Sequence, residues 1–234
     1  MSMPTAARDR RKPREPLVAP PPGPVRAIAE LPRRAGRYGV TVGEVVVAPV
    51  SVETLGDLRL KIGQSLDEGG VARLWAASRA TECFDKATAA LARRGRTRRD
   101  MERYLKQRDH APHDITWALD RLAQLGLLDD AAFARAFVDG PARSRGYGAR
   151  RIVAELRRRG VEALLVDQVI GARGEDAEEA EQAALAAAAT RRARSLRSLD
   201  AAVAQRRLTA WLVRRGFGPG AATQAARRAL ASDE

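Results

Sequence analysis

The chain has few of the residues that build disulfide frameworks, metal sites and catalytic triads. Its 234 residues include one cysteine and two histidines. Cys83 alone can form no intramolecular disulfide, which fits a reducing compartment. His110 and His113 lie near Pro112 with no second cysteine nearby, which argues against a zinc site. A Walker-type phosphate loop and a clustered acid–base pair are also lacking. We therefore expect a non-enzymatic protein with no metal and no cofactor.

Aromatic residues and long apolar runs are also scarce. Aromatics make up 4% of the chain, so base stacking on an aromatic platform is poorly supported. We expect Trp75, Trp117 and Trp211 to be packing residues. No apolar run approaches the roughly 18 residues of a membrane span, and no signal-peptide core is found. These absences predict a soluble, cytoplasmic protein with no membrane partner.

Positive charge is abundant. Lys and Arg number 42 against 29 Asp and Glu, which gives a net charge of +13, and almost all of the positive charge is arginine. Such an excess favours a polyanionic partner, which means nucleic acid, an anionic membrane or an acidic protein surface. A GC-rich genome also enriches alanine and arginine, so composition accounts for part of the excess.

The N-terminal third divides into two segments. Residues 1–36 hold eight of the twelve prolines and a basic cluster but no hydrophobic period, which predicts a disordered arm. Residues 37–66 alternate apolar and polar side chains, and Gly43-Glu44 has the form of a two-residue type II′ turn. We expect a small β cap here, made of a hairpin and a third strand over 58–62, with Pro49 at a break or an edge.

From residue 67 onward the pattern is helical and it repeats. The segments YLKQRDHAPHDI (104–115), ELRRRGVEALLV (155–166) and WLVRRGFGPGAA (211–222) align on Leu105, Leu156 and Leu212. In each segment a helix ends in basic residues, a short turn follows and another helix begins. The alignment predicts a mainly α protein with tandem three-helix repeats at 67–127, 128–173 and 174–234, which form an elongated, curved array.

The central repeat resembles a known family. GLLDD at 126–130, RGYGARRIVAEL at 145–156 and RRRGV at 157–161 look like the RecX family, regulators of the RecA recombinase, and WLVRRGF at 211–217 is similar to that family's third repeat. The resemblance covers about residues 81–231. It implies a protein that lies in the groove of the RecA filament on single-stranded DNA and reduces ATP hydrolysis and strand exchange in recombination and DNA repair. We expect it to act as a monomer.

Arginines are the candidate contact residues. The planar guanidinium group binds carboxylate or phosphate bidentately, and arginines seven residues apart share a helix face. Glu155 can pair with Arg151 or Arg159. One glutamate cannot neutralise all five arginines between residues 149 and 159. The candidates for contact with RecA or DNA are Arg143, Arg145, Arg150, Arg151, Arg157, Arg158, Arg214 and Arg215.

An alternative is a helix-turn-helix-like protein that acts directly on nucleic acid. Three-helix units with short turns fit that class. Its helices usually carry a mixture of Asn, Gln and Ser for base readout, which is not seen here. A gel-shift series separates the two hypotheses, because a defined operator bound far above random DNA favours the alternative.

Overall fold

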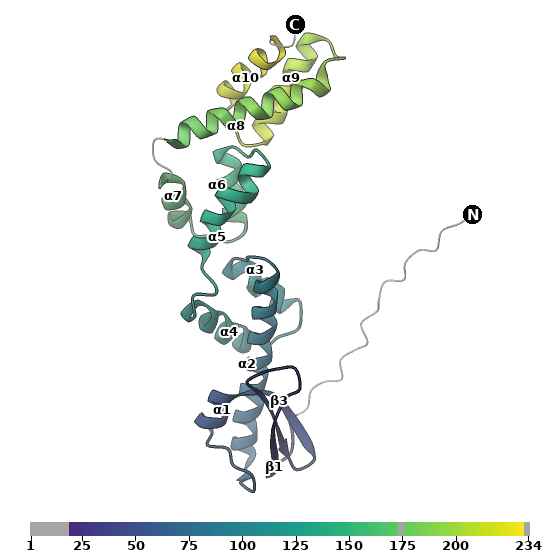
Figure 1. Ribbon diagram of the computed structural model, residues 1–234, viewed down its shortest axis with the longest axis vertical. Coiled ribbons are helices and arrows are strands. Elements are labelled where there is room, and N and C mark those ends of the chain that lie inside the picture. Colours follow the sequence, from purple (N-terminus) through teal and green to yellow (C-terminus); the bar gives the residue numbers. More distant parts are fainter. Residues whose placement is uncertain (1–18, 173–175, 232–234) are drawn as a thin grey trace, which may run out of the picture. The chain divides into compact units, whose positions relative to one another are not determined.

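The structure is a computed structural model that describes residues 19–172 and 176–231 (Figure 1). The described chain is mainly helical, with a small sheet near its N-terminus, as the sequence predicted. It forms two compact units, one that ends at Asp85 and one that begins at Lys86. The division falls inside helix α2 (Glu68–Arg93), which is 26 residues long.

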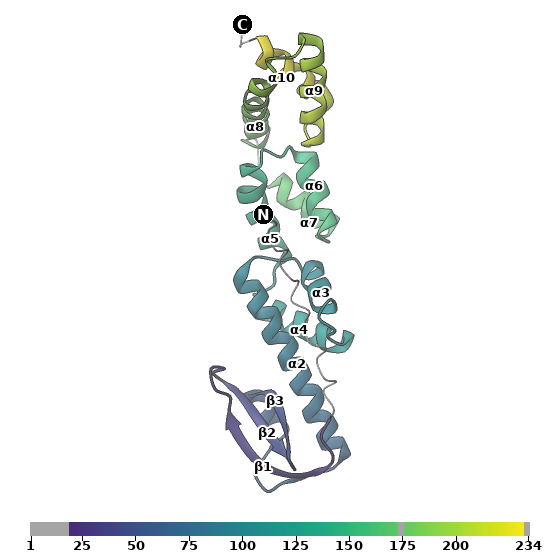
Figure 2. The same ribbon diagram turned by 90° about the vertical axis from the view of Figure 1, so that its right-hand side faces the viewer.

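The first unit contains an antiparallel sheet with the strand order β3-β2-β1-β4. The strands are β1 (Gly23–Glu30), β2 (Arg37–Val42), β3 (Val45–Ser51) and β4 (Ser65–Leu66). Val40 in β2 pairs with Ile28 on one side and with Val47 on the other. Buried strand valines pack with Val71 and Leu74 of α2, which runs beside the sheet (Figure 2). The sheet therefore buries one set of its apolar side chains against this helix.

The predicted hairpin is confirmed. Strands β2 and β3 are joined by Gly43-Glu44, and Gly43 has a φ of +60°, a conformation that glycine adopts without steric cost. Pro49 lies within β3, which is an edge strand of this sheet. Proline is tolerated there because an edge strand leaves some of its amides unpaired.

Two expectations for the N-terminal third are wrong. The predicted disordered arm, 1–36, includes strand β1, which pairs with β2 from Val25 to Glu30. Pro24 lies at the start of that strand, where proline is tolerated, so the dense prolines concealed a strand. Residues 1–18 of the arm lie outside the described residues.

The predicted third strand over 58–62 is also wrong. Ser51 accepts a hydrogen bond from the Thr54 amide and begins helix α1 (Val52–Asp57). The chain then turns at Arg59, where φ is +47°. The apolar Leu58 and Leu60 pack against the core from this turn, and the short strand β4 follows at Ser65–Leu66.

The second unit holds the helical repeats. The C-terminal part of α2 is followed by α3 (Arg98–Lys106) and α4 (Pro112–Gln124). The second repeat contains α5 (Asp130–Phe137), the π-helical turn η1 (Val138–Ala142), α6 (Ala149–Arg158) and α7 (Ala163–Gly171). The third contains α8 (Asp176–Ala193), the 3-10 turn η2 (Arg194–Leu196), α9 (Ala201–Arg214) and α10 (Pro219–Ala231).

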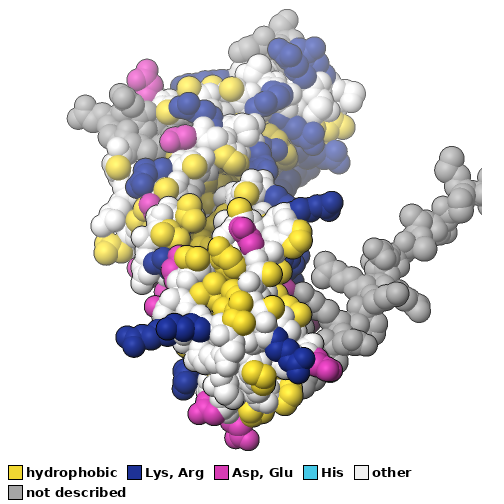
Figure 3. All heavy atoms as spheres, turned by 60° about the horizontal axis from the view of Figure 1, so that its bottom comes forward, with side chains coloured by type: hydrophobic (Ala, Val, Ile, Leu, Met, Phe, Trp, Pro, Cys, Tyr) yellow, Lys and Arg dark blue, Asp and Glu magenta, His cyan; other side chains and the backbone are white. Residues whose placement is uncertain are grey.

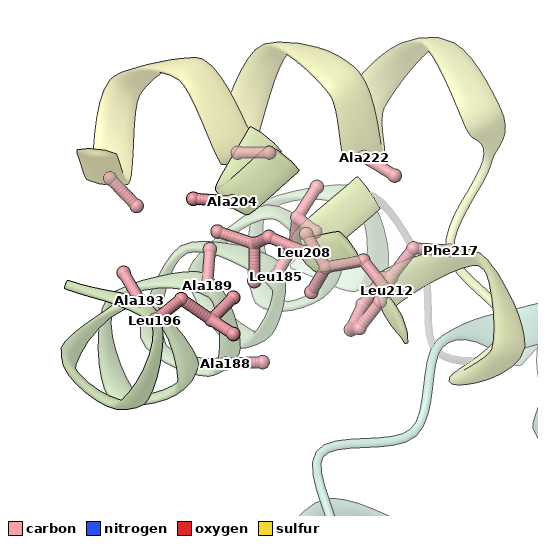
Figure 4. Close-up of a cluster of buried hydrophobic side chains, with 12 residues drawn as sticks. Leu185, Ala188, Ala189, Ala193, Leu196, Ala204, Leu208, Leu212, Phe217 and Ala222 are labelled. Atoms are coloured by element: carbon pink, nitrogen blue, oxygen red, sulfur yellow. The ribbon is translucent and has the colours of Figure 1, made fainter. Parts of the chain in front are cut away.

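The second and third repeats have separate cores. In the second repeat, Phe137, Ile152 and Leu156 are buried, while Phe133 is partly buried and stacks on Phe137 with ring centroids 6.3 Å apart. In the third repeat, leucines and Phe217 fill the space between three helices whose other contacts are mostly alanine (Figure 4). The small alanine side chains let α10 lie close to α8 and α9.

Candidate arginine interface

The middle helix of each repeat ends in the same way. Leu105, Leu156 and Leu212 are fully buried, and the residue four positions later has a positive φ in every case: Asp109 +60°, Gly160 +86° and Gly216 +95°. In the second repeat the Gly160 amide donates to the Arg157 carbonyl at 2.9 Å, and the Val161 amide donates to the Leu156 carbonyl at 3.1 Å. This is the Schellman arrangement. The first and third repeats form the corresponding bonds, which confirms the alignment on the three leucines.

Arg159, at the C-cap of α6, joins the first and second repeats. Its carbonyl oxygen accepts a hydrogen bond from Thr97 Oγ1 at 2.7 Å, and Thr97 is the N-cap of α3. Its guanidinium group donates to Asp100 at 3.2 Å and to Glu155 at 3.3 Å. The N-terminus of one middle helix therefore meets the C-terminal turn of the next.

Arg215 has the corresponding place between the second and third repeats. As the C-cap of α9, it accepts a hydrogen bond at its carbonyl from the Gly148 amide, 2.9 Å away, and Gly148 is the N-cap of α6. Its guanidinium group donates to the Arg145 carbonyl. A Cβ atom on Gly216 would lie 2.3 Å from the Arg151 amide nitrogen, so this approach requires glycine.

The eight predicted arginines lie on neighbouring segments of the second and third repeats. Seven of them are exposed, whereas Arg215 is half-buried at the joint. Four are on α6, Arg214 ends α9, and two precede α6. In the space-filling view, Lys and Arg side chains gather toward the end of the chain that carries the C-terminal helices (Figure 3).

Some of these arginines have acidic partners. Arg158 forms an ion pair with Glu155 at 2.7 Å, and the hydrogen bonds from Arg158 hold the pKa of Glu155 below its ordinary value. Arg157 lies 3.5 Å from Asp167. Glu155 thus pairs with Arg158 and Arg159, and the expected alternative pairing with Arg151 is not formed.

Other candidates have no acidic partner among the residues that the structure describes. The guanidinium group of Arg151 lies over the Tyr147 ring, 5.4 Å from its centroid. Arg143, Arg150 and Arg214 form no ion pair with another described residue. Their charge is therefore available to a partner at little cost, because no existing bond must be broken.

The structure adds two arginines that sequence reasoning missed. Arg191 and Arg192, in the last turn of α8, line a groove of about 430 Å³ together with Arg145 and Arg215. Trp211 also lines the groove, although the sequence assigned it to packing alone; it packs against the third core as well. No spacing rule links these positions, because they come from three separate segments.

Other kinds of site find no support in the described part of the chain. Its residues include no group of three or more His, Cys, Asp or Glu side chains that could hold a metal ion. None of its helices combines the length and the apolar character needed to cross a membrane.

The fold defines a protein of tandem three-helix repeats, and the exposed candidate arginines lie on the second and third of them. Two family models match it: "RecX, first three-helix domain" over residues 83–122 and "RecX, second three-helix domain" over residues 129–170. The regulatory protein RecX of Halorhodospira halophila is 40% identical over 150 residues, which cover 64% of this chain and 88% of that protein. That of Mycobacteroides abscessus is 37% identical over 196 residues, which cover 83% and 93%. The chain belongs to the RecX family.

Solved structures agree on the fold. A crystal structure of a regulatory protein RecX superimposes with a TM-score of 0.70 at 23% identity and covers 85% of this chain and 96% of that one. The first family match begins at residue 83, later than the predicted start of the first repeat at 67. The difference reflects α2, whose N-terminal residues pack against the sheet of the first unit.

Proposed function

We propose that this chain binds the RecA filament on single-stranded DNA and lowers RecA ATP hydrolysis and strand exchange. The observation that carries the proposal is membership of a family whose members are named regulatory protein RecX. In this proposal the chain acts as a non-catalytic monomer in the cytoplasm. Its partner is the filament, which offers acidic protein edges and DNA phosphates.

The arginines of the second repeat support this proposal through their distribution. Arg150, Arg151, Arg157 and Arg158 project from one helix of ten residues. The Arg157–Asp167 pair is half exposed on both sides, and exposed pairs contribute at most about 1 kcal/mol. A filament carboxylate or phosphate can therefore displace Asp167 at small cost. When several such contacts lie on one protein, each contact that forms raises the effective concentration of the others and so strengthens binding overall.

The joints have a different role in the same proposal. Arg159 is held by Asp100 and Glu155, and Arg215 by the Arg145 carbonyl. These two arginines hold successive repeats together, so in this proposal they set the spacing of the exposed arginines. Arg143, Arg145 and Arg214 extend the contact surface beyond α6.

A RecA ATPase assay on single-stranded DNA tests the function. The protein is titrated from substoichiometric amounts upward, and we expect hydrolysis to fall with concentration. Unchanged hydrolysis across the series would contradict the proposal. The alternative, a helix-turn-helix-like protein that reads DNA directly, predicts instead a gel shift on a defined duplex at concentrations far below those needed for random duplex.

A further inference from the structure

The groove of about 430 Å³ lies at the joint between the second and third repeats. Ser144, Arg145 and Tyr147 come from the segment before α6, in the second repeat. The third repeat contributes the ends of α8 and α9. The lining residues are Ser144, Arg145, Tyr147, Arg191, Arg192, Ser195, Trp211 and Arg215. No Asp or Glu is among the described residues that line this groove, so four guanidinium groups share it without a countercharge.

Two of the four guanidinium groups at this groove, those of Arg192 and Arg215, lie over aromatic rings. Arg215 is 4.4 Å from the Trp211 ring centroid and 5.9 Å from that of Tyr147, and Arg192 is 5.8 Å from that of Trp211. Stacking on a ring uses the face of a guanidinium group and leaves most of its N–H edge available to an acceptor. The charge at the groove therefore remains able to bind an anion.

The corresponding position in the second repeat shows the contrast. Arg159 is the counterpart of Arg215, since each lies three residues after the aligned leucine. The residue before that leucine is Glu155 in the second repeat and Trp211 in the third. Glu155 and Asp100 neutralise Arg159, whereas Trp211 stacks on Arg215 and supplies no charge. The third repeat thus has an aromatic side chain and an open cation where the second has an ion pair.

We propose that this groove binds a short stretch of single-stranded nucleic acid. Arg145, Arg191 and Arg192 bind the phosphodiester oxygens, and one unpaired base stacks on the Trp211–Arg215 pair. Guanidinium groups bind phosphate through paired N–H donors, and unstacked bases stack on aromatic rings and on guanidinium planes. An acidic peptide would satisfy the charge but would have no use for the two rings. A duplex keeps its bases stacked and paired, and so cannot present one to Trp211.

The location of the groove adds a consequence. Its walls belong to two repeats that are joined by the hydrogen bond from the Gly148 amide to the Arg215 carbonyl. A strand bound to both walls would hold this joint closed. Binding should therefore slow hydrogen exchange at the Gly148 amide.

The first test uses the full chain alone and a fluorescein-labelled oligothymidylate, with binding followed by anisotropy. Arg191→Ala/Arg192→Ala should lower the affinity at least about tenfold, because two guanidinium groups that donate to phosphate are removed. The slope of log K against the logarithm of the salt concentration is negative. In the variant it should become less steep by roughly 0.7 for each phosphate that is no longer neutralised. The matched control is Arg206→Ala/Arg207→Ala, which removes the same charge from exposed positions of α9 that do not line the groove. Circular dichroism verifies that both variants are folded.

The outcomes are distinct. An equal decrease in affinity in the two double variants would overturn the proposal, because binding would then follow net charge. Polyglutamate that competes as well as the oligonucleotide would overturn it in favour of an acidic peptide, and tighter binding of a duplex would overturn it as well. Hydrogen exchange on the unmodified chain gives an independent readout, and an unchanged Gly148 rate at saturating oligonucleotide would place the strand elsewhere. RecA is absent from these assays, so their failure leaves the proposed regulation of RecA untouched.

Discussion

Thr97 Oγ1 donates a hydrogen bond to the carbonyl oxygen of Arg159 at 2.7 Å, and this contact joins the N-terminus of α3 to the C-terminal turn of α6. One repeat later, the Gly148 amide donates to the Arg215 carbonyl at 2.9 Å and joins α6 to α9 in the same way. The two donors differ, a side chain in one joint and the backbone in the other. The acceptors are equivalent residues of successive repeats, so both joints connect the start of one middle helix to the C-cap carbonyl of the next.

Thr97 should be important for stability. It is fully buried, and it also caps α3 by accepting a hydrogen bond from the Asp100 amide at 3.1 Å. Thr97→Val keeps the shape of the side chain but leaves the Arg159 carbonyl and the Asp100 amide without this partner. We expect a decrease of about 1–3 kcal/mol in the free energy of unfolding, measured by urea denaturation. Thr97→Ser keeps the hydroxyl group and should be destabilised much less; equal destabilisation of the two variants would argue against the joint.

Gly216 should tolerate no side chain. Its φ is +95°, and a Cβ would lie 2.3 Å from the Arg151 amide nitrogen. Gly126 is a matched control, with a φ of +67° and nothing within 4 Å of its added Cβ. Gly126→Ala should cost only the backbone strain of about 1–2 kcal/mol. Gly216→Ala should cost clearly more, because the two repeats must separate to admit the methyl group. Equal unfolding midpoints for the two variants would show that the close approach is not important.

Glu155 makes the stability of the folded chain depend on pH, and the direction of this dependence follows from its pKa. The hydrogen bonds from Arg158 hold its pKa in the folded protein below the ordinary value of 4.5. A depressed pKa means that Glu155 contributes stability above 4.5, and that this contribution is lost as the pH falls through the folded pKa. Glu155→Gln should therefore lose less stability than the unmodified chain on acidification in that range. Urea denaturation at a series of pH values measures the difference.

Glu178→Gln, at an exposed position of α8, is the control for that experiment and should follow the unmodified chain. If Glu155→Gln did the same, the ion pairs of Glu155 would contribute nothing to folding.

The repeats could be predicted because their signal is periodic. Leu105, Leu156 and Leu212 each precede a residue of positive φ by four positions. The sequence alone shows this repeat, because the leucine, the basic residues after it and the turn are close together in the chain. Strand β1 could not be predicted in this way, since Pro24 and its neighbouring prolines suggested an arm. Its pairing with β2 depends on the tertiary structure.

The interface was only partly predictable. The arginines of α6 and the pairing of Glu155 with Arg159 follow from spacing on one helix. The ion pair of Arg157 does not, because its partner Asp167 lies on the next helix. Arg191 and Arg192 could not be predicted because they lie on a different helix from Trp211 and in a different repeat from Arg145. The low aromatic content likewise concealed that two aromatic rings line one groove.

Cosedimentation with the RecA–single-stranded-DNA filament tests the central claim most directly, namely that arginines of the second repeat contact the filament. Arg150→Ala/Arg157→Ala/Arg158→Ala should bind more weakly than the unmodified chain with helicity unchanged, and lowered salt should partly restore binding. The matched control is Arg206→Ala/Arg207→Ala/Arg227→Ala, which removes the same charge from other exposed positions. The account predicts that the control binds nearly as well as the unmodified chain. Equal binding by the α6 variant and the unmodified chain at physiological salt would contradict it.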